Sequence, residues 1–338
     1  MFQKHENLFI GVIFLSLFIF EGICQNLINV NQQNLHSNTL RNGLNKQSLK
    51  WDGLERTYLI YKPSLYNKNK PLPLVILLHG GGGTGTAMLN LTQGGFNKIA
   101  EREGFIVVYP DGIEKQWNDG REGMQYRAHK ENIDDIGFIS ILIDNLANQL
   151  NIDKTRVYVA GISNGALMAH RIGCELSEKV TAIAMIAGAI PKNKTYSTIP
   201  KKLVPIIIIN GTDDPLIPWK GGKIGFKSNI RYRGEVISTP DTVKFWIAIN
   251  KCSSKPTITY EPDKDKNDGT IARKEVYISD ENGAEVILYA IEGGGHTWPG
   301  GKQYLPEKII GKTNRDIDAN EIIWEFFKKQ VNQKVEND

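Results

Sequence analysis

The chain has 338 residues, of which 41% are apolar and 23% are charged, a balance that is ordinary for a globular protein. This length allows one large α/β domain or two smaller ones. Lys and Arg number 41 against 37 for Asp and Glu, and no basic stripe is interleaved with aromatic residues, so nucleic acid is excluded as an expected partner.

The N-terminal segment has the pattern of a secretory signal. A lysine precedes an apolar stretch at residues 8–20, which is too short to span a bilayer comfortably, and polar residues follow at once. We expect residues 1–24 to be removed by a cut before Gln25, and the mature chain to be secreted to the periplasm or the medium. A lipid anchor on Cys24 is disfavoured because the bulky Ile23 precedes it, so no stable membrane anchor is expected.

The remaining chain is expected to form one α/β domain. Residues 25–50 are rich in Asn and Gln and predict a flexible polar leader, and residues 51–333 predict the domain, with a tail at 334–338. Apolar or alternating runs predict strands at 56–63, 74–79, 105–109, 156–160, 180–187, 205–210 and 285–291. Periodic segments predict helices at 136–150, 165–176 and 241–250, and polar residues 257–279 predict a hairpin before the last strand. This alternation implies βαβ units and a mostly parallel sheet.

A glycine-rich loop, "LLHGGGGTG", follows the strand predicted at 74–79. Its backbone amides are free of side chains and can donate to an oxyanion, with Gly81 favoured and Gly82 as the alternative. We expect His79 to brace this loop. The glycines also fit a dinucleotide-binding pattern, but that interpretation leaves the groups described next without a role, so no cofactor is expected. Cys, His and carboxylate residues are not clustered at the spacing typical of metal ligands, so no metal is expected.

The stretch "VAGISNGAL" places Ser163 where an apolar strand meets a helix. Small neighbours at Gly161 and Gly165 permit the sharp, strained turn that exposes a nucleophilic hydroxyl. Taken alone, the pentapeptide "GISNG" at residues 161–165 is also compatible with a polar serine in an ordinary turn. If Ser163 is a nucleophile, the backbone N–H of Asn164 is the expected second oxyanion donor.

A serine nucleophile needs a base and an orienting acid, which in α/β-hydrolases follow in the order Ser, Asp, His. "GTDDPLIP" supplies the acid after a predicted strand, with Asp214 favoured over Asp213. "EGGGHTWPG" supplies His296 in a glycine-rich loop after the last predicted strand. The order predicts a triad of Ser163, Asp214 and His296.

The sequence leaves two interpretations open for each of four further residues. Trp298 follows the histidine and Trp117 lies in a predicted loop, so either could stack on a substrate or pack in the core. Cys174 and Cys252 remain after signal removal, and they form one disulfide or two buried thiols.

Several stretches together resemble the secreted polyhydroxybutyrate depolymerase and feruloyl esterase family, whose feruloyl members belong to carbohydrate esterase family one. They include "GLERTYLIYKP", "GFIVVYPDG", "GISNGALMAHRIGCE", "NGTDDPLIPWKGG" and "GGGHTWPG", and the resemblance runs over about residues 53–300. It implies a single-domain α/β-hydrolase fold with helices on both faces of a mostly parallel sheet, and a triad at Ser163, Asp214 and His296.

The resemblance implies a secreted serine esterase that works through an acyl-enzyme, with a phenolic or other acyl ester on polysaccharide, or a polyester oligomer, as its substrate. Feruloyl-type esters on plant polysaccharide are the leading expectation. The alternatives are a polyhydroxybutyrate or hydroxyalkanoate depolymerase, an acetyl xylan or short-chain carboxylesterase, and a non-catalytic secreted binding protein on a hydrolase fold. The sequence leaves the oligomeric state open.

Overall fold

The computed structural model describes residues 40–194, 196, 199–225, 233–279 and 284–331. All of these except Leu40 belong to one compact unit, Arg41–Asp338. The predicted signal at 1–24, most of the predicted leader and the tail at 334–338 lie outside the described residues. None of the described helices is long and apolar enough to cross a membrane.

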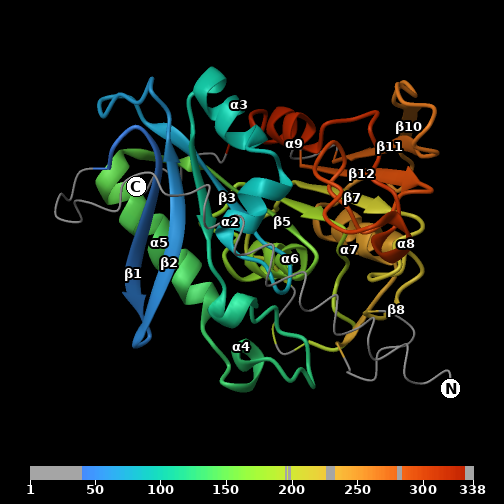
Figure 1. Ribbon diagram of the computed structural model, residues 1–338, viewed down its shortest axis with the longest axis horizontal. Coiled ribbons are helices and arrows are strands. Elements are labelled where there is room, and N and C mark those ends of the chain that lie inside the picture. Colours follow the sequence, from blue (N-terminus) through green and yellow to red (C-terminus); the bar gives the residue numbers. More distant parts are fainter. Residues whose placement is uncertain (1–39, 195, 197–198, 226–232, 280–283, 332–338) are drawn as a thin grey trace, which may run out of the picture. The chain divides into compact units, whose positions relative to one another are not determined.

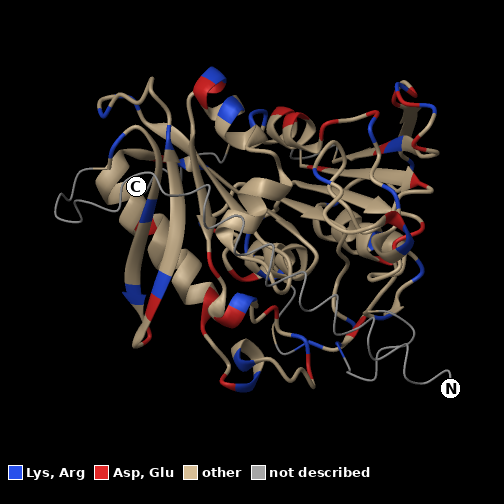
Figure 2. Cartoon of the chain, viewed as in Figure 1, with Lys and Arg blue, Asp and Glu red and all other residues tan. Residues whose placement is uncertain are grey.

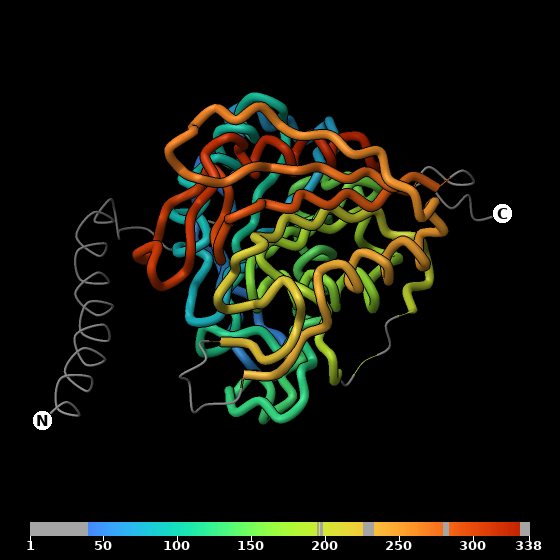
Figure 3. The backbone as a smooth tube through the Cα atoms, turned by 90° about the vertical axis from the view of Figure 1, so that its right-hand side faces the viewer, coloured from blue at the N-terminus to red at the C-terminus, as the bar shows by residue number. Residues whose placement is uncertain are grey.

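A mixed sheet, ten-stranded in the described residues, forms the centre of the unit (Figure 1). In spatial order its strands are β1 (Gly43–Trp51), β2 (Leu54–Lys62), β4 (Ile106–Pro110), β3 (Leu72–Leu78), β5 (Ile152–Ile162), β6 (Ala182–Ile186), β7 (Ile206–Gly211), β12 (Glu285–Glu292), β11 (Ile271–Ile278) and β10 (Thr257–Tyr260). The strands from β4 to β12 in this order run parallel, whereas β1 and β2 at one end and β11 and β10 at the other are antiparallel. The predicted strands, the mostly parallel sheet and the hairpin at 257–279 are therefore confirmed. The hairpin lies along an outer edge, in orange in Figure 3.

Helices cover both faces of the sheet, as predicted. One face carries α2 (Gly85–Leu91), α3 (Gly95–Glu103) and α9 (Ala319–Phe327), and the other carries α5 (Asp135–Leu150), α6 (Asn164–Glu175) and α7 (Thr239–Ile249). Short elements complete the described chain: η1 (Ile113–Lys115), α4 (Arg127–Lys130), α8 (Glu307–Ile310), β8 (Gly222–Lys223) and β9 (Glu235–Val236). One apolar core cluster lies between the sheet and the first group of helices and includes Phe96, Tyr158, Trp324 and Phe327.

Two of the three predicted helices begin at side-chain caps. The Asp134 side chain accepts the Gly137 N–H at 2.8 Å and starts α5, and Phe138, Leu142 and Leu146 then bury one face of that helix. Ser238 caps α7 in the same way, with a proline in the first turn. The helix α6 begins directly after Ser163.

Residues 43–50, which were predicted as part of the flexible leader, instead form most of β1. The strand pairs with β2 through a two-residue turn, in which Asp52 and Gly53 have φ of 49° and 73°. Positive φ at both central residues is typical of the hairpin turn that Asp-Gly favours. Leu49 and Trp51 are half-buried and alternate with exposed residues, so the strand is amphipathic although its composition is polar.

Positive and negative side chains are interspersed over the described part of the chain (Figure 2). Most ion pairs are exposed, such as the pair of Arg102 on α3 with Glu321 on α9 at 2.7 Å. The pair of Arg56 and Asp135 is buried and joins β2 to α5 at 2.5 Å. Burial raises the pKa of Asp135 even though Arg56 opposes this shift.

Candidate active site

Ser163 lies on the turn between β5 and α6. Its backbone has φ 57° and ψ −123°, a conformation that is strained for a residue with a side chain. A Cβ on Gly161 would stand 2.2 Å from the Gly165 carbonyl oxygen, and one on Gly165 would stand 2.4 Å from that of Leu78. Both glycines are therefore needed for the turn, which has the form of a nucleophile elbow.

His296 and Asp214 are hydrogen-bonded to each other in a buried position. His296 Nδ1 lies 2.7 Å from Asp214 Oδ2, and the two residues are 2% and 7% exposed. The other carboxylate oxygen of Asp214 accepts the backbone N–H groups of Leu216 and Ile217 at 2.7 and 2.8 Å. These two bonds fix the carboxylate in an orientation that holds the imidazole. Asp213, the alternative acid, is exposed and bonds instead to the Thr212 hydroxyl.

The sheet topology explains why these residues share one edge. Ser163 follows β5, Asp214 follows β7 and His296 follows β12. The strands β5, β6, β7 and β12 are adjacent and parallel, so their carboxyl ends open at the same edge. Residues that are 133 positions apart in the sequence are thereby brought to one end of the sheet.

The glycine-rich loop after β3 lies directly against the elbow. A Cβ on Gly80 would stand 3.4 Å from the Ser163 Cβ. The Gly82 N–H is donated to the Lys115 carbonyl at 2.8 Å, and that of Gly83 to the Gly80 carbonyl at 3.0 Å. The Gly81 N–H makes no hydrogen bond with any residue that the structure describes. Of the two loop donors considered, Gly81 is the one that is free to bind an oxyanion.

Asn164 is the first residue of α6, so its backbone N–H has no acceptor within the helix. This N–H lies immediately after the elbow, where the positive end of the helix dipole also favours negative charge. Gly81 and Asn164 therefore both retain backbone donors beside Ser163.

His79 braces the glycine-rich loop. Its Nδ1–H donates to the Gly80 carbonyl at 2.8 Å, and its Nε2 accepts the Gly112 N–H at 3.0 Å. Burial lowers the pKa of His79 to about 4, more than the neighbouring Gly80 carbonyl and Asp111 raise it. The imidazole is therefore neutral near pH 7, which matches its use of one nitrogen as a donor and the other as an acceptor.

The Asn164 side chain is held by a buried network that the sequence did not reveal. Its Oδ1 accepts the Trp117 N–H at 2.8 Å, and its Nδ2 donates to the Trp117 carbonyl and to Asp119 Oδ2 at 3.1 and 2.7 Å. Asp119 is fully buried and also binds Arg121 and His129, at 2.8 and 3.0 Å. Burial alone would raise the pKa of Asp119, but the Arg121 charge and the His129 hydrogen bond outweigh it and hold the pKa below its usual range.

The expectation that Trp117 or Trp298 stacks on a substrate is wrong, because both side chains are fully buried. Trp117 Nε1 donates to the His79 carbonyl at 3.0 Å, beneath the glycine-rich loop. Trp298 Nε1 donates to Asn320 Oδ1 at 3.1 Å, and its ring packs edge-on against Phe96. Both tryptophans support loops of the site from within the core.

The two cysteines do not form the disulfide that the sequence left open, because both are free thiols. Cys174 is buried and its Sγ lies 3.8 Å from His170 Nε2. Cys252 is half-buried against the Ala284 carbonyl at 3.6 Å. The thiols take part in different local contacts.

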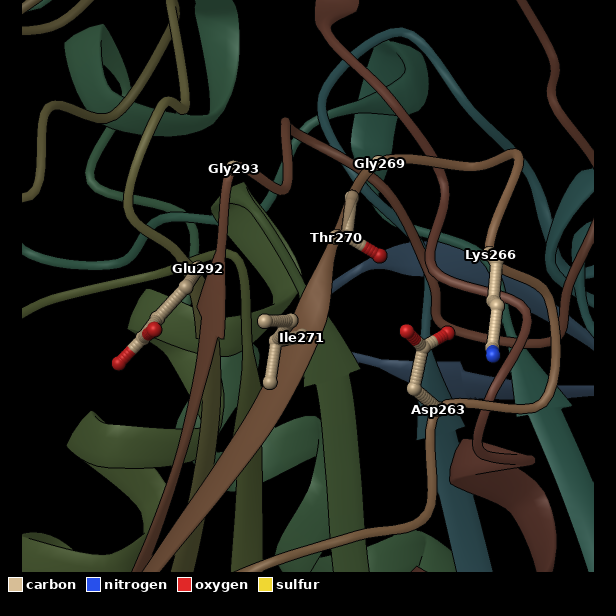
Figure 4. Close-up of a pocket in the computed structure, with 7 residues that line it drawn as sticks. All are labelled: Asp263, Lys266, Gly269, Thr270, Ile271, Glu292 and Gly293. Atoms are coloured by element: carbon tan, nitrogen blue, oxygen red, sulfur yellow. The ribbon is translucent and has the colours of Figure 1, made fainter.

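A surface cavity lies between the β10–β11 loop and the end of β12 (Figure 4). Asp263 and Lys266 line one side of it, and Glu292 and Gly293 line the other. The cavity carries charges of both signs and is not lined by Ser163 or the other two triad residues. Among the described residues, no three His, Cys, Asp or Glu side chains are grouped so that they could hold a metal ion.

A mostly parallel sheet with helices on both faces, a serine elbow after β5 and an aspartate–histidine pair at the same edge define an α/β-hydrolase. The family model described as phospholipase/carboxylesterase matches residues 65–230. The fold is that of the α/β-hydrolases, and the resemblance to feruloyl esterases that the motifs predicted is confirmed, with similarity to an acetylxylan esterase as well.

Two relatives illustrate this similarity. A protein of Nocardia uniformis subsp. tsuyamanensis that is named as an esterase, NocK, is 27% identical over 259 residues, which cover 75% of this chain and 74% of the relative. Feruloyl esterase B of Piromyces equi is 27% identical over 255 residues, which cover 73% of this chain but only 44% of that longer protein. The chain thus spans less than half of the length of this feruloyl esterase.

A solved structure supports the fold. The acetyl xylan esterase from Aspergillus awamori superposes with a TM-score of 0.54 at 16% identity, covering 84% of this chain and 99% of that enzyme. At this identity the similarity establishes the fold alone.

Proposed function

We propose that the protein is a serine esterase in which Ser163, His296 and Asp214 form the catalytic triad. The observation that carries this proposal is the buried hydrogen bond between His296 and Asp214, at the sheet edge that also bears the Ser163 elbow. A non-catalytic binding protein would have no need for this arrangement.

The proposed reaction has two halves. Ser163 Oγ attacks the ester carbonyl carbon while His296 Nε2 takes the hydroxyl proton, and Asp214 stabilises the imidazolium through Nδ1–H. The N–H groups of Gly81 and Asn164 hold the oxyanion. The tetrahedral intermediate collapses, the alcohol leaves with the proton from His296, and the acyl group stays on Ser163. Water then attacks the acyl-enzyme by the same steps and releases the acid.

The substrate that we propose is a feruloyl-type ester on plant polysaccharide. The named activity of feruloyl esterase B supports this class, and the sequence similarity to a bifunctional acetylxylan esterase/xylanase makes an acetyl ester on xylan the second candidate. Hydrolysis of methyl ferulate, acetylated xylan and hydroxybutyrate oligomers, measured in parallel, separates these substrates. A preference for hydroxybutyrate oligomers would instead identify a polyester depolymerase.

The test of the mechanism is Ser163→Ala, with hydrolysis of 4-nitrophenyl acetate as the readout. We expect kcat to fall by at least ~10⁴-fold, because the nucleophile is lost. A fluorophosphonate probe should label the wild-type protein at Ser163 and leave the variant unlabelled. Wild-type turnover by a correctly folded Ser163→Ala protein would exclude this triad, and absence of labelling and turnover in the wild type would favour the binding protein.

We also propose that the protein is secreted. The support is the sequence pattern of residues 1–24. Mass spectrometry of the protein collected from the periplasm or the medium should find Gln25 as the first residue, and an intact N-terminus in the cytoplasm would contradict the proposal.

A further inference from the structure

The Gln116 side chain is largely buried, but its carboxamide atoms reach solvent and have no hydrogen-bonding partner among the described residues. Gln116 is 9% exposed, and its carboxamide makes no hydrogen bond with any residue in the described ranges. Because the amide atoms are accessible and bonded to no described residue, the Nε2–H groups are free to donate to a bound molecule.

The Gln116 carboxamide lies next to Gly81. A Cβ built on Gly81 would stand 3.0 Å from Gln116 Oε1 and 3.1 Å from Nε2. The Gln116 Cδ would be farther away, at 3.4 Å, so the amide faces Gly81 with its oxygen–nitrogen edge. Gly81 is also the residue whose N–H remains free for an oxyanion, so the unpaired amide is next to that donor.

The backbone on both sides of Gln116 is tied to the oxyanion elements. The Lys115 carbonyl accepts the Gly82 N–H at 2.8 Å, and the Trp117 N–H donates to Asn164 Oδ1 at 2.8 Å. Gln116 is therefore held between a residue bonded to the glycine-rich loop and a residue bonded to the start of α6. These bonds fix the Gln116 backbone relative to both backbone donors, so the side chain starts from a preorganised position beside them.

We propose that Gln116 is a third oxyanion donor, whose Nε2–H group binds the developing negative charge together with the N–H groups of Gly81 and Asn164. This inference rests on the proposed function, because it assumes a tetrahedral intermediate on Ser163. The amide suits the role because it is neutral and carries two N–H groups, one of which can turn toward the oxyanion while the other contacts substrate. A Cβ at residue 81 would crowd this amide.

Two variants of Gln116 test the inference, and Gln125→Ala is the matched control because Gln125 is exposed and nine positions further along the chain. Gln116→Ala should lower kcat for 4-nitrophenyl acetate by roughly 10²-fold with little change in KM, as expected for the loss of one oxyanion donor. Gln116→Glu keeps the size of the side chain but places a carboxylate beside the oxyanion, so kcat should fall further than in Gln116→Ala. Gln125→Ala should hydrolyse the ester at the wild-type rate.

The order of the two variants separates catalysis from packing. A structural role would make the near-isosteric Gln116→Glu milder than Gln116→Ala, and this order would overturn the inference. Wild-type kcat in both variants, or a rise in KM alone, would overturn it as well. Thermal unfolding checks that each variant is folded, and Gln116→Met preserves the packing if Gln116→Ala does not fold.

Fluorophosphonate labelling keeps this test distinct from that of the proposed function. If the wild type is labelled at Ser163 but Gln116→Ala is labelled at the same rate, only the inference on Gln116 fails. If the wild type itself is neither labelled nor active, the proposed function fails.

Discussion

At the residue scale, the position of Asn164 depends on Asp119, which is distant from it in the sequence. The Asp119 carboxylate is buried and binds the Asn164 side chain, Arg121 and His129. A buried carboxylate that satisfies an arginine and an asparagine amide at once fixes both, because each would lose its partner if it moved. Asp119 is therefore a positioning residue for the proposed oxyanion site.

We expect Asp119→Asn to lower the free energy of unfolding by about 3 kcal/mol or more at pH 7, because it leaves the buried Arg121 guanidinium without a counter-charge. Urea unfolding measures this change. Asp144→Asn is the control, since the Asp144 pair with Lys179 is 40% exposed at the carboxylate and such pairs contribute about 1 kcal/mol or less. Equal effects of the two substitutions would contradict a structural role for the buried network.

The contribution of Asp119 to the free energy of unfolding should depend on pH in one direction. The pKa of Asp119 is lower in the folded protein than its ordinary value of 3.8. Its contribution to stability is therefore fully present above that value and is lost as the pH falls through the lower folded pKa. The difference between wild type and Asp119→Asn should stay constant from neutral pH to about pH 5.

Sequence reasoning at this scale found the residues that belong to short motifs. Ser163 and His296 lie in short glycine-rich motifs that are typical of a serine elbow and of a histidine loop. Asp214 follows a predicted strand and stands between them in the Ser, Asp, His order of α/β-hydrolases. Gln116 and Asp119 belong to no such motif. Gln116 lies next to Gly81 in the loop after β3, and Asp119 binds Asn164 at the start of α6, and both neighbours are distant in the sequence. The burial of Trp117 and Trp298 was not predictable either, since adjacency in the sequence does not determine on which side of a loop a ring lies.

At the element scale, the strand β1 is held to the rest of the domain through α5. Trp51 Nε1 at the end of β1 donates to Asp134 Oδ2 at 3.1 Å, and Asp134 caps α5. The sequence concealed this strand because Asn45 and Gln47 occupy two of its inward positions, whereas the parallel strands are continuous apolar runs and were found. In the structure, the strand is stabilised instead by its pairing with β2 and by the contact of Trp51 with α5.

Gly137→Ala tests this docking. In a free helix the change from Gly to Ala stabilises by about 1 kcal/mol. Here a Cβ would stand 2.0 Å from Asp134 Oδ2 and 2.4 Å from Trp51 Cζ2, so we expect the substitution to destabilise the protein by about 1–3 kcal/mol instead. Thermal or urea unfolding gives the sign directly.

Trp51→Phe is the companion variant for Gly137→Ala. It removes the hydrogen bond to Asp134 but keeps an aromatic ring, and should cost about 1 kcal/mol. A stabilising Gly137→Ala together with a silent Trp51→Phe would mean that β1 does not pack on α5 in solution.

At the scale of the whole molecule, the stability of the fold at acidic pH depends on two buried histidines, His79 and His170, which stay unprotonated in the folded protein. Burial lowers the pKa of His79 to about 4 and that of His170 to about 3, from an ordinary value of 6.5. Below pH 6.5 the unfolded chain therefore binds protons at these positions that the folded chain does not bind. The free energy of unfolding consequently decreases as the pH falls, by about 2 kcal/mol for each histidine between pH 6.5 and pH 5.

His170→Phe separates this effect from other sources of acid sensitivity, because His170 lies outside the proposed catalytic machinery. His170 packs edge-on against Phe245 and Trp246, and its Nδ1 is buried without a partner among the described residues. A phenyl ring keeps the aromatic contacts and removes the unpaired nitrogen, so stability at pH 7.5 should be maintained and the fall between pH 6.5 and pH 5 should be smaller than in the wild type by about 2 kcal/mol. Urea unfolding at a series of pH values measures both quantities. His170→Ala, which leaves a cavity, should lose stability at every pH but show the same reduced slope, and an unreduced slope in both variants would mean that His170 is protonated in the folded protein.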